Sequence, residues 1–372
     1  MAVQPSMFKA FLPRLCKGLV AVASLLLPLN LFAAPPPGLL DNDHAAVRSV
    51  MAVQDEVTAE WMRQPEVLGT AVGLDTAGVP SLVVYVDRDA DNAGDIARSF
   101  PAKARNVNVR VELTDKFRAM ARPGGGGGGV SHTARQTPPI QLGTSGGWSK
   151  DLANGYCCGG TLGSLVSIGG VQHILSNYHV LEADIVSGGN GTVATTGDSV
   201  LQPGLLDINC TAANGQSVGT LVKRSSLPSS NVDCAIAQVV PGMVASNGAI
   251  LEIGPISSQT VAAAINKAVK KSGRTTGFTR STISGLNATV SITYENECAG
   301  GTAFTKTFTG QIVIKNNASR FLAGGDSGSL MVEDVTTNAR AVGLLFAGSS
   351  TTAIANPINE VLSFLGATMV GN

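Results

Sequence analysis

The chain is poor in charged and aromatic side chains. Only 14% of its 372 residues are charged, the 26 Lys and Arg balance the 26 Asp and Glu, and aromatic residues make up 5%. Binding of nucleic acid requires clustered Lys and Arg that neutralise phosphates, so the composition excludes a nucleic-acid partner. Apolar residues make up 44%, too many for a disordered chain. With so few aromatics, the core has to be built from Val, Ile, Leu and Ala, which favours strands.

Long hydrophobic runs are also scarce, and the one at the N-terminus is short. Lys9, Arg14 and Lys17 precede an apolar stretch at residues 18–32, and Ala33 and several prolines follow it. This order is typical of a secretory signal peptide. The stretch falls short of the roughly 20 residues that a spanning helix needs. We expect a signal peptide at residues 1–33, a secreted or periplasmic protein, and no stable membrane anchor after signal removal.

Cysteine is infrequent, and export makes disulfide bonds the default interpretation of it. Five cysteines follow the signal, so at most two bridges form and one thiol remains. The spacings C-x-x-C and H-x3-H that favour zinc do not occur, and no metal site is predicted. Spacing does not determine the pairing. The pairs we favour are Cys210 with Cys234, and Cys298 with either Cys157 or Cys158.

The region after the signal alternates helical and strand patterns. Apolar residues recur at helical spacing over 43–68, and a second helix fits 91–98. Three segments read as strands: 69–74, 81–86 and the strictly alternating 106–113. We expect a small α/β domain at residues 40–122, which as a propeptide would block the rest of the chain or help it to fold. Its lone histidine, His44, is expected at the surface or at a helix start.

Glycine is abundant, and six of the 44 glycines stand together after Pro123. A phosphate-binding glycine loop would need a preceding strand, a following helix and usually a lysine. Here the run leads instead to Pro138 and Pro139. We therefore expect a flexible Gly/Pro-rich linker at residues 123–139.

Residues 140–372 consist of short apolar runs separated by Gly, Asn, Ser and Thr. Such frequent short strands with turn signals predict a β-barrel or a sandwich. The expected strands are 161–168, 171–175, 234–240, 288–294, 311–314, 330–333 and 341–346. Only Pro357 to Leu365 has helical spacing, with proline in the first turn. This part is expected to be a mainly β domain closed by a C-terminal helix.

Three separated segments carry side chains suited to nucleophilic catalysis. Ser327 lies in the run GGDSGS, where flanking glycines permit the tight turn that exposes a nucleophile. His179 follows the apolar strand QHILS, where a general base can be held, and His173 inside that strand is the alternative base. Asp233 stands directly before another apolar strand and could orient the histidine. By themselves, the serine run fits a surface loop and Asp233 fits a turn.

These segments resemble the chymotrypsin/trypsin-like serine peptidases, in particular exported bacterial ones with an N-terminal α/β domain. The chain order of histidine, aspartate and serine is the chymotrypsin order. The resemblance covers residue 140 to the C-terminus and is carried by the runs LSNYHVL, LQPG, VDCAIA, KSGRTTG, GDSGS and GLLFAG. It implies a double β-barrel with a C-terminal helix, and a serine endopeptidase acting on proteins or peptides without a cofactor.

The resemblance also implies the role of each site residue. Ser327 would be the nucleophile, His179 the general base and then acid, and Asp233 the group that orients it. The backbone N–H groups of Gly325 and Ser327 would form the oxyanion hole. Asp326 would form an ion pair that holds this loop.

The sequence departs from the family pattern in the loops around the site. No Ile-Val-Gly-Gly start follows a basic cleavage site, so either Asp326 pairs with another cation or activation differs from the trypsin route. The pocket-floor position, six residues before the nucleophile, is Phe321, which does not favour Lys or Arg substrates. Phe346 and Gly348 align with the segment that pairs with substrate backbone, without the usual central aromatic. Arg274 either braces the oxyanion loop or contacts substrate, or belongs to a structural turn, the reading we favour.

Two other functions remain open from the residues alone. One is a catalytically silent chaperone or adhesion module that keeps the peptidase fold. The other is an α/β binding unit whose peptidase cuts only its own linker.

Overall fold

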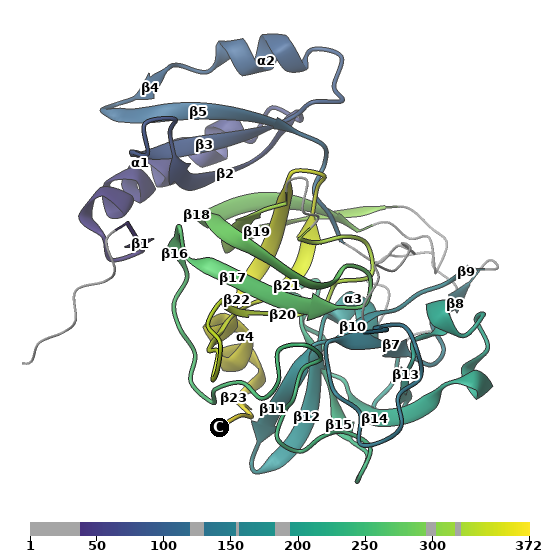
Figure 1. The fold of residues 1–372 in the computed structure, drawn as a ribbon. Coiled ribbons are helices and arrows are strands. Elements are labelled where there is room, and N and C mark those ends of the chain that lie inside the picture. The colour runs from purple at the N-terminus through teal and green to yellow at the C-terminus, as the bar shows by residue number, and fades with distance from the viewer. Residues whose placement is uncertain (1–37, 120–129, 154–155, 183–193, 295–302, 317–320) are drawn as a thin grey trace, which may run out of the picture. The chain divides into compact units, whose positions relative to one another are not determined.

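The computed structural model describes residues 38–119, 130–153, 156–182, 194–294, 303–316 and 321–372 (Figure 1). The predicted signal peptide and the glycine run lie outside these residues, as does Cys298. Within the described part of the chain, no helix is both long and apolar enough to cross a membrane.

The first half of the mainly β region is a closed antiparallel barrel. Its strands are β7 (Thr144–Trp148), β10 (Gly160–Leu162), β11 (Ser164–Ile168), β12 (Val171–Ser176), β13 (Ser199–Gln202), β14 (Gln216–Val222) and β15 (Ala235–Val239). β10 and β11 are two halves of one run that bends at Gly163; the first half pairs with β7 and the second with β12, which closes the ring. A side chain at Gly163 would collide with the backbone carbonyl of Gly328, so this bend also admits the loop that holds Ser327.

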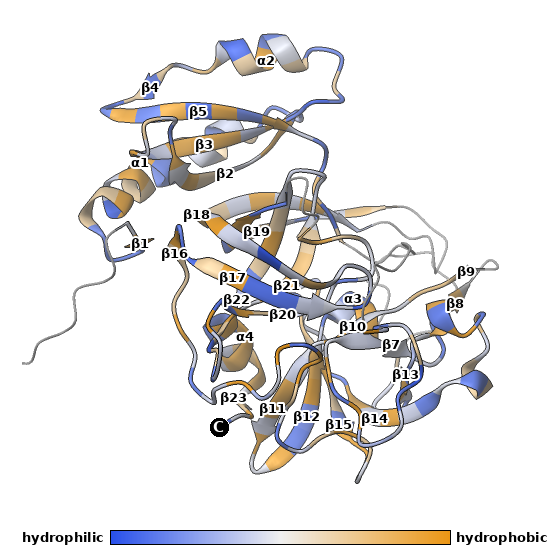
Figure 2. Ribbon diagram, viewed as in Figure 1, coloured by the Kyte–Doolittle hydropathy of each residue, from blue (hydrophilic) through white to orange (hydrophobic). Residues whose placement is uncertain are grey.

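A second antiparallel barrel follows in the chain. Its strands are β17 (Ala268–Gly273), β18 (Gly277–Tyr294), β19 (Phe304–Lys315), β20 (Leu330–Glu333), β21 (Ala341–Gly348) and β22 (Thr352–Pro357). β17 pairs with both β18 and β20, so the six strands form a ring. The helix α4 (Ile358–Leu365) then packs its apolar face against the core of the first barrel. The strands of both barrels carry apolar stretches (Figure 2).

The segment expected as a separate α/β domain shares a sheet with the second barrel. It contains α1 (Ala45–Trp61), β2 (Val67–Leu74), β3 (Pro80–Asp87), α2 (Ala93–Ser99) and β5 (Val107–Thr114). β18 has 18 residues and extends beyond its partner β17. β2 pairs antiparallel with the part of β18 that extends beyond β17. β3 and β5 continue the sheet, with α2 as the crossover between them. The helix predicted over 43–68 is shorter, since α1 ends at Trp61 and β2 begins at Val67.

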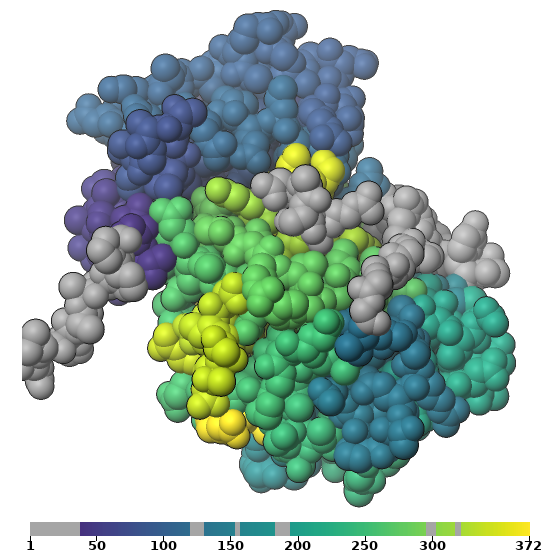
Figure 3. All heavy atoms as spheres, in the orientation of Figure 1, coloured from purple at the N-terminus to yellow at the C-terminus, as the bar shows by residue number. Residues whose placement is uncertain are grey.

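The core of this segment is continuous with the barrel core as well. Val47 and Val50 of α1 lie in the same apolar cluster as Ile283 of β18 and Ile314 of β19. In Figure 3 the blue atoms of the segment lie directly against green and yellow atoms of the barrel. His44 caps α1, its Nδ1 accepting from the N–H of Ala46, which confirms the expected helix start. Remaining short strands are β1 (Leu40–Asp41), β4 (Lys103–Ala104), β6 (Arg118–Ala119), β8 (Leu152–Ala153), β9 (Tyr156–Cys157), β16 (Ala264–Ile265) and β23 (Thr368–Met369).

The second part of the expected linker is anchored to the protein. His132 is buried and bonds to Gly143 O and to the Glu252 carboxylate, each over 2.7 Å. The Gln136 N–H donates to the side chain of Gln202. Residues 131–136 are therefore held in place by specific contacts, which the proline-rich composition does not reveal.

In the described part of the chain a disulfide bond joins Cys157 and Cys210, so the predicted pairing of Cys210 with Cys234 is wrong, and Cys157 is not the partner of Cys298. Cys234 is a free, fully buried thiol inside the first barrel. It precedes β15 and lies in the core cluster of the first barrel, whereas Cys210 is half-buried after the 3-10 turn Leu205–Asp207. Burial raises the pKa of the Cys234 thiol.

Candidate active site

His179 and Asp233 lie together in the first barrel. β12 ends at Ser176 and leads into the short helix α3 (Tyr178–Leu181), which carries His179, while Asp233 precedes β15, the neighbour of β12. The His179 Nδ1 and the Asp233 Oδ2 are 2.6 Å apart, and the carboxylate is fully buried. The second oxygen, Oδ1, accepts the N–H of Tyr178 over 2.7 Å. This geometry fixes the ring so that Nε2 is directed away from Asp233.

Ser327 comes from the second barrel, in the loop before β20. Its backbone oxygen accepts the N–H of Thr161, and a side chain at Gly160 would touch both Ser327 O and Val180, the neighbour of His179. Because Gly160 has no side chain, the serine loop can pack directly against the histidine helix. The Ser327 Oγ donates to Phe346 O over 3.2 Å, and His179 Nε2 has no hydrogen-bond partner among the described residues. The serine–histidine hydrogen bond is therefore not formed in this conformation.

Two peptide groups in the serine loop are oriented through their carbonyls. Gly324 O accepts the hydroxyl of Thr275 over 2.6 Å, and Asp326 O accepts the hydroxyl of Ser329 over 2.6 Å. Because a trans peptide places its N–H opposite its carbonyl, the N–H groups of Gly325 and Ser327 are directed away from these hydroxyls. Neither N–H donates to another group in the described part of the chain. Two backbone donors of this kind can stabilise an oxyanion where they converge on it.

Gly325 itself requires glycine, because its φ is +94° and a side chain would meet Thr275 and Arg274.

The cation that Asp326 needs is Lys271 on β17. The Lys271 Nζ lies 3.3 Å from Asp326 Oδ2, and both side chains are fully buried. The carboxylate also accepts the N–H groups of Thr275 and Thr276 over 2.9 and 3.1 Å. Burial lowers the pKa of Lys271, while the charge of Asp326 opposes this shift. This buried network holds the loop in place without a free N-terminus.

Arg274 braces the same loop from the outside. Its guanidinium makes two hydrogen bonds to the carboxylate of Asp207, over 2.7 and 2.6 Å. Its N–H donates to the Thr161 hydroxyl, which in turn donates to Gly325 O over 2.9 Å. Arg274 lies in the turn between β17 and β18, as the preferred structural reading expects, and these contacts show that the turn also braces the serine loop.

Tyr294, at the end of β18, was not singled out from the sequence. Its hydroxyl donates to Asp233 Oδ2 over 2.9 Å, the same oxygen that contacts His179. The rings of Tyr294 and His179 meet edge to face at 5.9 Å. Burial, and then the charge of Asp233, raise the pKa of Tyr294, so this hydroxyl stays a donor.

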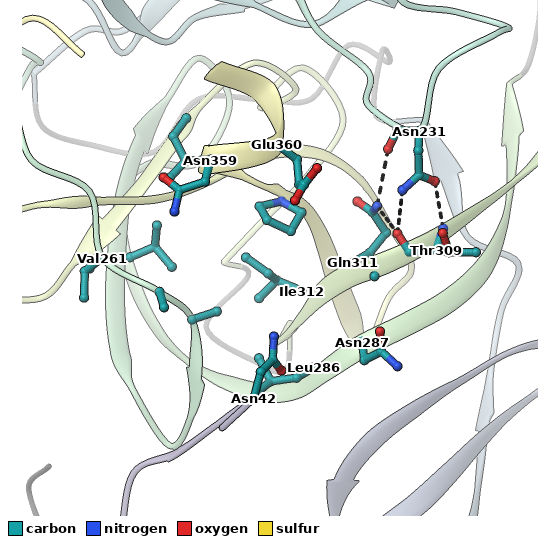
Figure 4. Close-up of a pocket in the computed structure, with 16 residues that line it drawn as sticks. Asn42, Asn231, Val261, Leu286, Asn287, Thr309, Gln311, Ile312, Asn359 and Glu360 are labelled. Atoms are coloured by element: carbon teal, nitrogen blue, oxygen red, sulfur yellow. Dashed lines mark hydrogen bonds between the residues drawn. The ribbon is translucent and has the colours of Figure 1, made fainter. Parts of the chain in front are cut away.

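A hydrogen-bonded chain reaches Asp233 from a polar cavity behind it. The Asp233 N–H donates to Asn356 Oδ1, and Asn356 donates to Gln311 over 2.6 Å. Gln311 lines a cavity of about 480 Å³ together with Asn231 and Thr309, which are hydrogen-bonded to each other (Figure 4). The position of Asp233 is thereby set by buried amides.

The remaining predicted site residues fall in different places. Phe346 and Gly348 lie on β21 beside Ser327, whereas Phe321 is fully buried in a separate apolar cluster with residues of α1. His173 lies on β12 with its Nδ1 2.9 Å from Val171 O, and burial lowers its pKa. No contact joins His173 to Asp233 in the described chain. Within the same residues, no group of three or more His, Cys, Asp or Glu could hold a metal ion.

Comparisons with known proteins give limited matches. The family model of the Nal1 C-terminal domain matches residues 229–356, which include Asp233 and Ser327. Similar solved structures include a glutamic acid specific serine protease (19% identity, 62% of this chain and all of that chain, TM-score 0.41), Cellulomonas bogoriensis chymotrypsin (21%, 63% and 99%, 0.38) and Thermobifida fusca protease A (21%, 63% and 99%, 0.40). The comparison with curated proteins found no match.

The expected mainly β fold is confirmed by two closed six-stranded barrels and a C-terminal helix. His179 and Asp233 come from the first barrel and Ser327 from the second. The chain therefore has the fold of the chymotrypsin-like serine proteases.

Proposed function

We propose that this chain is an exported serine endopeptidase. The observation that carries the proposal is the 2.6 Å contact between His179 and a fully buried Asp233, with Ser327 held beside the histidine helix. Aspartate in this position fixes the tautomer of the histidine and stabilises the imidazolium that forms during catalysis. Burying a carboxylate against a histidine costs desolvation free energy, so this arrangement favours a catalytic role over a purely structural one.

The chemistry would proceed through an acyl-enzyme. Rotation of Ser327 Oγ from Phe346 O towards His179 Nε2 allows the histidine to accept the hydroxyl proton as Oγ attacks the scissile carbonyl. The N–H groups of Gly325 and Ser327 then receive the developing oxyanion. The histidine gives its proton to the leaving amine, the peptide C–N bond breaks, and water activated by the same histidine hydrolyses the ester. No cofactor enters this sequence.

Hydrolysis of a peptide library, followed by mass spectrometry, tests this function. The wild-type protein should release new peptide ends, and Ser327→Ala should release none. Ser329→Ala serves as a matched control for serine removal in the same loop, and it should retain cleavage at a reduced rate because Ser329 orients the Ser327 N–H. Equal cleavage by wild type and Ser327→Ala would contradict the proposal.

A second candidate is a binding module with a silent active site. It is favoured by the Ser327 Oγ hydrogen bond to Phe346 O and by His179 Nε2, which has no hydrogen-bond partner in the part of the chain that the structure describes. In that case the wild type would bind peptides and release no fragments from the library.

A further inference from the structure

The strand β6 pairs with β21 beside the loop that carries Ser327. Ala119 pairs with Ala347 and Arg118 with Gly348, in antiparallel register. β22 pairs with the same two residues of β21 from its other side. β6 therefore lies along the same edge of β21 as β20, just beyond the first residue of β20.

The direction of β6 leads to the nucleophile. On this edge of β21, Leu345 bonds to Ser329, Phe346 O accepts the Ser327 hydroxyl, and Ala347 pairs with Ala119. Because the pairing is antiparallel, the chain runs from Arg118 to Ala119 towards the level of Ser327. A peptide strand added to this edge antiparallel to β21 would run in the same direction, towards Ser327.

The residue before β6 fills an apolar subsite. Phe117 is fully buried and packs in one cluster with Tyr178, Tyr294 and Phe346, all close to the triad. Its ring meets Tyr85 edge to face at 5.4 Å. Its backbone oxygen accepts the Thr293 N–H over 2.9 Å. Segment 117–119 is thus held by main-chain pairing and one deep aromatic anchor, which is how strand addition achieves affinity and specificity.

We infer that residues 117–119 occupy the position of a substrate strand on β21, and that the substrates are extended peptides with a large aromatic side chain where Phe117 lies. The inference rests on the proposed function, because it defines the substrate of that site. A small side chain is expected two residues later, where Ala119 lies. The chain in this conformation is therefore self-occupied, and an incoming peptide has to displace its own segment.

Attachment in the same chain makes this competition strong. A tethered segment acts at an effective concentration in the millimolar range. A free peptide of similar sequence therefore binds more weakly to the intact chain than to a chain whose segment is released or weakened. The full burial of Ser327 agrees with an occupied site.

Binding in the full chain carrying Ser327→Ala tests the inference without catalysis. The probe is a fluorescent peptide with the sequence of residues 115–119, Asp-Lys-Phe-Arg-Ala, and its Kd is measured by fluorescence anisotropy. Adding Phe117→Ala to the protein should tighten binding at least about tenfold, since it removes the competing anchor. Replacing the phenylalanine of the peptide by alanine should weaken binding by a similar factor.

Two further variants keep the test decisive. Phe100→Ala removes an aromatic of the same α/β segment, packed on Trp61, and should leave the Kd unchanged. Ala119→Pro breaks the ladder and keeps the Phe117 ring, and it should also tighten binding. Unchanged affinity in both Phe117→Ala and Ala119→Pro, or indifference to the phenylalanine of the peptide, overturns the inference. Failure of the proposed function would instead appear as absent peptide cleavage by the Phe117→Ala protein that keeps Ser327.

Discussion

Tyr294 and His179 share one oxygen of Asp233, at 2.9 and 2.6 Å. The tyrosine comes from the second barrel and the other two residues from the first, so the orienting carboxylate is held from both sides of the interface between the barrels.

Replacing Tyr294 by phenylalanine tests this positioning role. The Asp233 Oδ2 that contacts His179 loses a donor, so the carboxylate is held less firmly against the histidine. We expect kcat/KM at neutral pH to fall about tenfold, in line with one lost hydrogen bond to a charged group, with the loss in kcat and with KM nearly unchanged. Tyr85→Phe, the same change away from Asp233, should leave both constants in place. Equal losses in the two variants would contradict a specific role of the Tyr294 hydroxyl.

Thr275→Val should weaken the oxyanion hole. Valine preserves the shape of threonine but cannot donate to Gly324 O, so the peptide that carries the Gly325 N–H is free to turn. Losing one oxyanion donor costs on the order of 10²–10³ in rate, and we expect a loss of tenfold or more in kcat with little change in KM. Thr260→Val, which removes a surface hydroxyl contact to Asn359, is the matched control. A change confined to KM would contradict this account.

Lys271→Met should destabilise the protein strongly. It leaves the carboxylate of Asp326 buried without its cation, a change that typically costs about 3–5 kcal/mol. Urea unfolding measures the loss, and Arg280→Met is the control because its ion pair with Asp334 is exposed. Adding Asp326→Asn to Lys271→Met should recover part of the stability. Equal losses in the free energy of unfolding in Lys271→Met and Arg280→Met would show that the buried pair has no special role.

Asp198 should contribute to stability against acid. Burial opposes its ionisation, yet the donors Lys150, the Thr195 N–H and Trp148 together lower the pKa of Asp198 to about 2. Its folded pKa lies below the ordinary value of 3.8, so the stabilisation is present above pH 4 and is lost as the pH falls towards 2. The stability difference between wild type and Asp198→Asn, followed by Trp fluorescence in urea at several pH values, should shrink over this range. A difference independent of pH would contradict the assignment.

Much of the fold could be predicted because short apolar runs map directly onto strands. β20 and β12 coincide with their predicted segments to within a residue. β18 was recognised only at its end, because Gly285 and Asn287 interrupt its pattern, and the register shifts at these positions. Its pairing with β2 depends on contacts far apart in the sequence, which periodicity does not reveal.

The candidate triad could be proposed because each member lies beside an apolar strand in a recognisable run, but its partners could not. Lys271 follows Val269 on the inward face of β17, and a lysine at such a position needs a buried carboxylate; this signal was present and was missed. Tyr294 has the same parity as Ile292 on β18, so alternation places it inside the barrel. Its contact with Asp233 depends on the docking of the two barrels, which no local pattern encodes.

The most direct test of the account is the reaction of Ser327 with a fluorophosphonate, read by mass spectrometry of the intact protein and its peptides. We expect one adduct, located on Ser327, that forms much more slowly in His179→Ala and is absent in Ser327→Ala. Absence of an adduct in both the folded wild-type protein and the folded Phe117→Ala variant would contradict the assignment of a nucleophilic serine.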